Sequence, residues 1–178
     1  MRVVIIRHGK VDYRWEKCYT SDEFDLACKQ YDKALIEEMS YEVPCFDFHH
    51  VFVSTLPRSR DTARVIFGEL KVESTDTLNE VPLRSFFESE KSLPIWFWNI
   101  AGRLQWMFNR SRQIEGRRET RQRANQFIDL LCSLDEDTAV VTHGFYMHTL
   151  LKEMRKRGFT ILKSKMNYKN GNYVIAER

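Results

Sequence analysis

The sequence predicts an α/β protein, a three-layer α/β/α sandwich with a mostly parallel sheet. Short apolar runs rich in β-branched residues, typical of buried strands, alternate with longer segments whose apolar residues recur at helical spacing. The expected strands cover residues 3–6, 51–53 and 139–141, and a last strand at 173–176 could lie at an edge of the sheet. This alternation favours crossover helices on both faces of one sheet.

Four helices follow from the apolar spacing. The first is expected over residues 22–39, where the apolar stripe consists of Phe24, Ala27, Cys28, Tyr31, Ala34, Leu35 and Met39. The second begins at Pro57 and continues through residues 60–67. The third carries the stripe Ala124, Phe127, Ile128, Leu131 and Leu134, and the fourth begins at Gly144 and turns inward Met147, Leu150, Leu151 and Met154. His148 lies on this last helix, where we expect it in the core or behind the site.

Length and composition indicate one domain over residues 1–178, with a cap or insert at about 81–118. A chain of 178 residues that is 43% hydrophobic can bury one substantial core, and no Gly- or Pro-rich linker divides it. The net charge of +3 is too small to suggest nucleic-acid binding. The apolar segment 95–108 is interrupted by Asn99, Arg103 and Gln105, so we expect no membrane span and a soluble, cytoplasmic protein.

Two His-Gly pairs each follow an apolar run, and they are the most informative feature of the chain. Arg7-His8-Gly9 follows residues 3–6, and Thr142-His143-Gly144 follows residues 139–141. Ligands bind at the carboxyl ends of strands in open α/β sheets, and glycine permits close approach of a ligand. Imidazole can act as a nucleophile and guanidinium suits phosphate, so the pairs point to phosphoryl chemistry.

Two further segments supply the remaining groups. The stretch Ser54-Thr55-Leu56-Pro57-Arg58 follows a strand and opens a helix, which places Arg58 near a helix N-terminus that favours anions. Glu80, in Leu78-Asn79-Glu80, offers a carboxylate in a loop. Glu73, Glu88 and Glu90 are alternatives for this carboxylate, whereas Arg60 and Arg64 are expected to be charges on the helix surface.

These residues, in this order, resemble the histidine phosphatase superfamily, also called the phosphoglycerate mutase-like family. The resemblance covers most of the chain and rests on Arg7-His8-Gly9, the S-x-L-x-R-x-x-x-T-A pattern of residues 54–63, Leu78-Asn79-Glu80 and Thr142-His143-Gly144. It implies that a phosphoryl group is transferred to His8, that Arg7, Arg58 and His143 surround this group, and that Glu80 exchanges the proton. The chain departs from the family where an Asn often helps to bind phosphate, because Arg14 falls at that place.

We therefore expect a phosphomonoester hydrolase that acts through a phosphohistidine on a small phosphorylated molecule, with Gly9, Arg14 and Gly144 contacting the substrate. No cofactor or metal is expected, since cationic side chains can neutralise the phosphate. Cys45, His49 and His50 cluster in sequence, but they lack the second ligand pair that zinc sites normally show. No nucleic-acid or membrane partner is expected. A phosphoglycerate mutase-type phosphomutase and a non-catalytic module that binds a phosphorylated ligand remain alternatives.

The segment 93–123 combines aromatic and basic residues. Trp96, Phe97, Trp98, Trp106 and Phe108 precede Arg110, Arg112, Arg117, Arg118, Arg121 and Arg123. One interpretation is an ordinary amphipathic helix with a solvated basic face. The other is a lid whose arginines, with Arg14, attract a substrate that carries more negative charge than one phosphate.

Overall fold

The computed structural model describes residues 1–37, 40–41, 43–44, 47–162 and 169–178. Its central sheet has six strands in the order β4-β3-β6-β1-β8-β7. The strands β4 (Glu73–Thr75), β3 (His50–Ser54), β6 (Thr138–Thr142) and β1 (Arg2–Arg7) run parallel. The strands β8 (Tyr173–Glu177) and β7 (Thr160–Ile161) continue the sheet antiparallel. The predicted mostly parallel sheet is confirmed.

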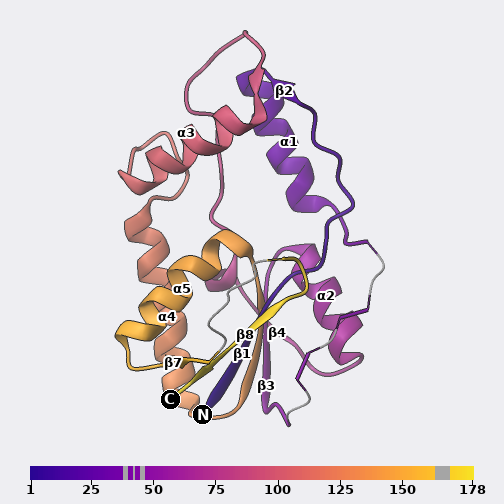
Figure 1. Ribbon diagram of the computed structural model, residues 1–178, viewed down its shortest axis with the longest axis vertical. Helices are drawn as coiled ribbons and strands as arrows, with labels where there is room; N and C mark the ends of the chain where they lie inside the picture. The colour runs from indigo at the N-terminus through magenta and orange to yellow at the C-terminus, as the bar shows by residue number, and fades with distance from the viewer. Residues whose placement is uncertain (38–39, 42, 45–46, 163–168) are drawn as a thin grey trace.

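Helices cover both faces of this sheet (Figure 1). On one face, Val3 and Ile5 belong to the core formed with α4 (Arg117–Leu134) and α5 (Gly144–Lys156). On the other face, Val4 and Ile6 pack in a second core with α2 (Pro57–Phe67). Successive residues of a strand point to opposite faces, so a strand that is apolar throughout fits a sheet covered on both sides. The three layers are those that the sequence predicts.

The helices that border the site keep close to their predicted positions. α2 begins at Pro57, and the inward stripes of α4 and α5 are buried as expected, apart from the partly buried Leu134. His148 is exposed rather than in the core. Its ring centroid lies 6.4 Å from that of Phe145, and the alternative place behind the site stays a prediction.

The first helix is shorter than predicted. α1 spans Ser21–Lys33, and its N-terminus is closed by a capping box between Thr20 and Glu23. It ends because Ala34 is extended and Ile36 forms an antiparallel bridge with Val11. Met39, which the predicted stripe included, lies outside the described residues.

The last strand does not lie at an edge. β8 forms hydrogen bonds with β1 on one side and with β7 on the other. The two-residue strand β7 follows a glycine, and no strand-length apolar run marks it in the sequence. The edge position predicted for residues 173–176 is therefore occupied by this short strand.

A smaller unit lies beyond the sheet, at the end of the molecule away from the two termini (Figure 1). We call α1, β2 (Cys18–Tyr19), β5 (Leu93–Pro94) and α3 (Ile95–Met107) the cap. β2 pairs with β5, and buried Trp98 of α3 donates its indole N–H to the carbonyl of Tyr19 at 3.0 Å. The cap thus joins the expected insert to an N-terminal segment that the sequence analysis did not include in it.

The 3-10 helix η1 (Asp76–Leu78) leads from β4 into the loop that carries Glu80. Over the residues that the structure describes, no helix combines the length and apolar character needed to cross a membrane.

One pH-dependent contact holds the β4 side of the sheet. His50 Nδ1 lies 2.8 Å from Glu73 Oε1, and its Nε2 lies 3.1 Å from Glu136 Oε2. The hydrogen bond with Glu73, followed by the charges of both carboxylates, raises the pKa of His50 above its ordinary value.

The pKa of His50 is higher in the folded state than in the unfolded chain, so its stabilising effect is complete below about pH 6.5 and is lost as pH rises through the folded-state pKa. We expect the free energy of unfolding to fall by roughly 0.5 kcal/mol between pH 6 and pH 8.5, since the pair is largely exposed. His50→Gln should remove this difference in urea unfolding measured at both pH values. His49→Gln is the control, because His49 is the exposed neighbour of His50. If the pH difference of the wild-type protein persisted in His50→Gln but disappeared in His49→Gln, the assignment to His50 would be wrong.

Candidate active site

The register between two parallel strands brings the two His-Gly pairs together. Arg7 at the end of β1 pairs with Thr142 at the end of β6, and the backbone N–H of His8 donates to the carbonyl of Thr142 at 2.9 Å. His8 and His143 therefore leave the sheet side by side, with ring centroids 4.9 Å apart. Both imidazoles are buried, with 2% of His8 and 0% of His143 exposed.

The hydrogen bond at Nδ1 of His8 fixes its tautomer. Nδ1 lies 2.7 Å from the carbonyl oxygen of Gly9, and because a carbonyl can only accept, Nδ1 carries the proton. Nε2 is then the unprotonated nitrogen. Burial, followed by the charges of Arg58 and Arg7, lowers the pKa of His8 to about 3, so the ring is neutral at neutral pH.

Gly9 holds the turn that makes this bond possible. Its backbone N–H donates to Oγ1 of Thr62 at 2.8 Å, and Thr62 in turn donates to the carbonyl of Arg58 at 2.6 Å. A Cβ at Gly9 would lie 2.1 Å from the hydroxyl oxygen of Tyr41. A side chain here would therefore require the side chain of Tyr41 to move.

His143 has the opposite tautomer, and it connects two helices. Its Nδ1 accepts from Nε of Arg58 at 3.1 Å, so the proton lies on Nε2, which is 2.6 Å from Oγ of Ser54. Oγ of Ser54 donates onward to Oγ of Ser59 at 2.9 Å. Complete burial, then the neighbouring His8 and Arg58, lowers the pKa of His143 well below its ordinary value.

Arg58 is a fully buried cation in the first turn of α2. Besides its bond to His143, it contacts Asp32 of α1 through Nη1, with an N to O distance of 3.1 Å, and its guanidinium lies 5.0 Å from the ring centroid of Tyr31. Its Nη2 is buried and has no hydrogen-bond partner among the described residues. An unsatisfied buried donor is costly, so this nitrogen marks a place for an anion.

Glu80 lies at the N-terminus of α5. Its Oε1 accepts from the backbone N–H groups of Tyr146 and Val81, each at 2.9 Å, and its Oε2 accepts from that of Phe145 at 3.2 Å. Free N–H groups at a helix N-terminus favour a negative charge. These three backbone N–H groups therefore hold the carboxyl group of Glu80 in one orientation.

A cavity of about 800 Å³ opens between the cap and the ends of the strands. Arg7, Arg58 and Glu80 line it, together with Asp32 of α1 and Arg103 of α3. The two histidines are not among the described lining residues, and they lie directly behind the lining residue Arg58 through its contact with His143. Of the four glutamates considered from the sequence, Glu80 faces this cavity, whereas Glu73 contacts His50 and Glu88 contacts Arg112.

The described part of the chain contains no group of three or more His, Cys, Asp or Glu residues that could hold a metal ion. Cys45, which the sequence places near His49 and His50, lies outside the described residues. Both ring nitrogens of His50 contact carboxylates, those of Glu73 and Glu136.

The site holds a buried histidine next to two arginines, a second histidine and a carboxyl group in a fixed position. The family to which the sequence is matched agrees with this arrangement. The model of the histidine phosphatase superfamily (branch 1) matches residues 3–177. This chain belongs to that superfamily. The family predicted from the four motifs is thereby confirmed, and no curated protein matches the sequence.

Several solved structures share the fold of this chain. The YhfR protein of Bacillus stearothermophilus is 19% identical, with 99% of this chain and 90% of that chain covered and a TM-score of 0.60. A mycobacterial glucosyl-3-phosphoglycerate phosphatase is 18% identical, with coverage of 98% and 88% and a TM-score of 0.59. A phosphoglycerate mutase from Bacillus anthracis is 17% identical, with coverage of 98% and 86% and a TM-score of 0.57. At these identities the likeness concerns the fold alone.

Most of the predicted site residues meet at one place. They are Arg7, His8, Gly9, Arg58, Glu80, His143 and Gly144. Arg14 is exposed and is not among the described residues that line the cavity. Its role in substrate binding stays a prediction.

Three contributors were missed from the sequence. Asp32 and Tyr31 contact Arg58, and Asn170 donates its amide N–H to the carbonyls of His8 and Gly9, each at 3.1 Å. Tyr31 was noticed only as an apolar member of a helical stripe, and nothing around Asp32 or Asn170 in the sequence signals a site. Their contacts depend on pairings between distant segments.

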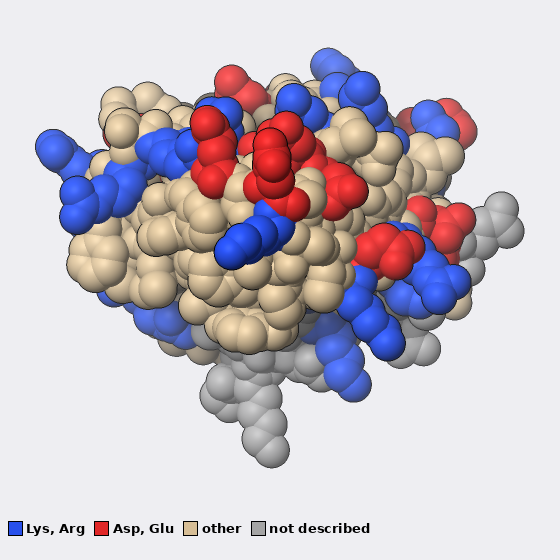
Figure 2. All heavy atoms as spheres, turned by 90° about the horizontal axis from the view of Figure 1, so that it is seen from above, with Lys and Arg blue, Asp and Glu red and all other residues tan. Residues whose placement is uncertain are grey.

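The basic residues of segment 93–123 are divided between the cavity wall and the surface. Arg103 and Arg123 line the cavity, whereas Arg112 donates to the carbonyl of Ser85 at 2.8 Å and contacts Glu88. Arg110 is exposed. Seen from above, acidic side chains lie among the basic ones, so the basic side chains do not form a single patch on this face (Figure 2).

Gly144 gives a direct test of how Arg7 is placed. A Cβ at Gly144 would lie 2.9 Å from Nε and 3.0 Å from Cζ of Arg7, so the guanidinium must move to admit it. We expect Gly144→Ala to weaken the binding of inorganic phosphate by about tenfold while helix α5 stays intact, because small displacements of a binding group are costly. Calorimetric titration and thermal unfolding measure the two effects. If the phosphate affinity did not change, or if it fell only because the protein unfolded, this account of how Arg7 is placed would be wrong.

Proposed function

We propose that this histidine phosphatase hydrolyses a phosphomonoester through a phosphohistidine at His8. The observation that carries the proposal is the hydrogen bond from Nδ1 of His8 to the carbonyl of Gly9 at 2.7 Å, because it leaves Nε2 as the nitrogen with a free electron pair. The low pKa of His8, about 3, keeps that pair available at neutral pH. A neutral imidazole beside two arginines is suited to attack a bound phosphoryl group.

In the first half-reaction, Nε2 of His8 forms a bond to phosphorus while the ester P–O bond breaks. Arg7 and Arg58 neutralise the phosphoryl oxygens, which is the main contribution a protein makes to phosphoryl transfer. The unpaired Nη2 of Arg58 supports this role. His143 completes the pocket beside His8 and orients Arg58 through its Nδ1.

Glu80 exchanges the proton in both half-reactions. In its acid form it protonates the leaving oxygen, and as a carboxylate it then accepts a proton from the water that attacks phosphorus and releases His8. Its fixed position on the N–H groups of Phe145 and Tyr146, at the wall of the cavity, supports this assignment. The mechanism uses side chains alone.

A single assay separates this proposal from a phosphomutase and from a module that only binds a phosphorylated ligand. Phosphate release from an aryl phosphate is measured with and without monophosphoglycerate and bisphosphoglycerate. Hydrolysis without these additions supports the phosphatase. Transfer of phosphate between positions of phosphoglycerate would indicate a mutase, and binding without either reaction would indicate the module.

The covalent intermediate can be trapped. Rapid quenching with a labelled aryl phosphate should give an acid-labile, base-stable label on the wild-type chain, since a phosphohistidine forms. His8→Ala should abolish both the label and turnover, whereas His143→Ala should slow turnover and leave some label. A label of the same stability on His8→Ala would place the nucleophile elsewhere.

The role of Glu80 depends on the leaving group. An alkyl phosphate needs a proton on its leaving oxygen, whereas nitrophenyl phosphate has a good leaving group. Glu80→Gln should slow phosphorylation by the alkyl ester about 10²–10⁴-fold and affect nitrophenyl phosphate far less. Equal losses in pre-steady-state rates for both esters would show that Glu80 is not the acid.

A further inference from the structure

The cavity is much larger than a phosphate group requires. Its volume of about 800 Å³ falls within the range of about 300–1,000 Å³ in which pockets bury most of a drug-sized ligand. Arg7, Arg58 and Glu80 occupy only the end next to the strands. The remaining wall must therefore contact the alcohol part of the phosphoester.

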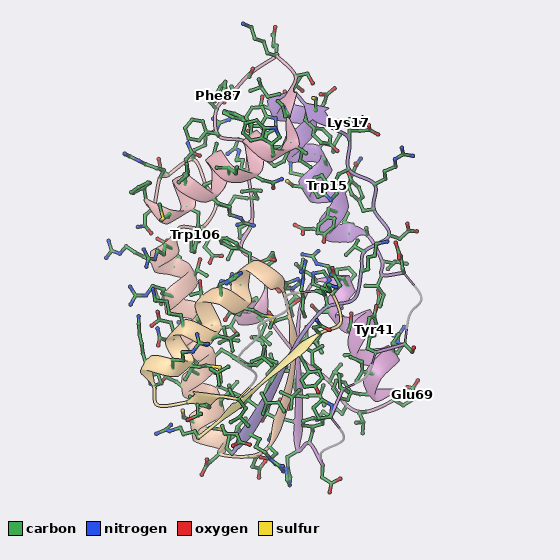
Figure 3. All side chains as sticks on the ribbon, in the orientation of Figure 1. Trp15, Lys17, Tyr41, Glu69, Phe87 and Trp106 are labelled. Carbon is green, nitrogen blue, oxygen red and sulfur yellow. The ribbon has the colours of Figure 1, made fainter. Side chains whose placement is uncertain are left out.

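One side of that wall is aromatic and apolar. Trp15 and Tyr31 line it, with Leu83 and Ile95 beside them. Trp15 packs on Tyr31 with ring centroids 5.2 Å apart and is held edge-on by Tyr13 at 5.0 Å. Figure 3 shows Trp15 beside α1. Rings fixed in this way offer a preformed surface to a flat apolar group.

This aromatic wall begins directly at the phosphate end of the cavity. The guanidinium of Arg58 lies 5.0 Å from the ring centroid of Tyr31, and the ring of Tyr31 in turn packs against that of Trp15. A phosphoryl group on Arg58 would therefore place the atoms bonded to its ester oxygen beside aromatic rings. The thiol of Cys28 also lines this side, and burial raises its pKa to about 12, as expected in surroundings of low polarity.

The charges of the lining residues balance. The cations among the described lining residues are Arg7, Arg58, Arg103 and Arg123. The carboxylates are Asp32, Asp76, Glu80 and Glu115. Two of the carboxylates contact two of the cations, Asp32 with Arg58 and Glu115 with Arg123. The lining therefore carries no surplus of positive charge, so beyond a phosphoryl group at Arg7 and Arg58 a second anionic group would meet carboxylates.

We propose that the substrate is a monophosphate ester of an uncharged, flat and apolar alcohol, such as a phenol or a larger aromatic alcohol, whose ring system lies against Trp15 and Tyr31. This inference rests on the proposed phosphatase function. It replaces the expectation of a polyanionic substrate that the arginines of the segment 93–123 raised, because Arg112 is bound to the chain itself and Arg110 does not line the cavity. Trp15 is then a specificity-determining residue.

The test compares 1-naphthyl phosphate with glycerol 3-phosphate and 3-phosphoglycerate. Wild-type kcat/KM should be highest for 1-naphthyl phosphate. Trp15→Ala should lower this value about 5–10-fold, mainly through KM, because an aromatic contact of this size is lost. It should leave glycerol 3-phosphate nearly unchanged, and Trp15→Phe should restore most of the difference.

Trp96→Ala is the matched control, since Trp96 lies on α3 with 61% of its surface exposed and is not among the described lining residues. A preference for 3-phosphoglycerate, or equal losses for all three esters in Trp15→Ala, would overturn the inference. Equilibrium binding of 1-naphthyl phosphate to the His8→Ala variant tests the surface without turnover. If no ester is hydrolysed, the proposed function fails; the substrate inference then stands only if Trp15→Ala still weakens this binding.

Discussion

The parallel register in which Arg7 of β1 pairs with Thr142 of β6 sets the distance between the two loops that form the site. A slip of one residue would send Val3 and Ile5 to the α2 face and Val4 and Ile6 to the α4 face. Both faces are filled, so the packing of two cores opposes such a slip. The separation of the two imidazoles is therefore as firmly fixed as the interior of the sheet.

Burial and nearby positive charge together keep both histidines neutral. Desolvation is the larger cause of the low pKa of each, and the charge of the buried Arg58 lowers both pKa values further. In return, His143 accepts one N–H of Arg58 and Asp32 contacts another, which offsets much of the cost of burying the cation. The Nη2 group has no hydrogen-bond partner among the described residues, and in the proposed mechanism a phosphoryl oxygen supplies it.

The strand ends could be predicted from the sequence because the informative residues are local. An apolar run, a histidine and a glycine are contiguous, and β1 and β6 follow from their composition alone. The pairing of β2 with β5 and the early end of α1 could not be predicted, since both depend on partners distant in sequence, such as Val11 for Ile36. The arginines of segment 93–123 could not be sorted for a related reason: composition shows their charge, but not that Arg123 lines the cavity while Arg112 is bound to Ser85.

The cap and the phosphate end of the site share a helix, which links the recognition of the alcohol to the placement of the phosphate. α1 carries Tyr31 and Asp32 toward Arg58, and the same helix presents Phe24, which stacks on Trp98 of α3 at a centroid distance of 5.8 Å. Trp98 is completely buried, so a change in how α3 packs must be transmitted to α1 rather than absorbed by solvent. Because Asp32 holds Arg58, a shift of α1 would reach the guanidinium that faces the phosphoryl group. Under the proposed function, substrate contacts made by the cap would therefore affect the position of the guanidinium that binds the phosphoryl group.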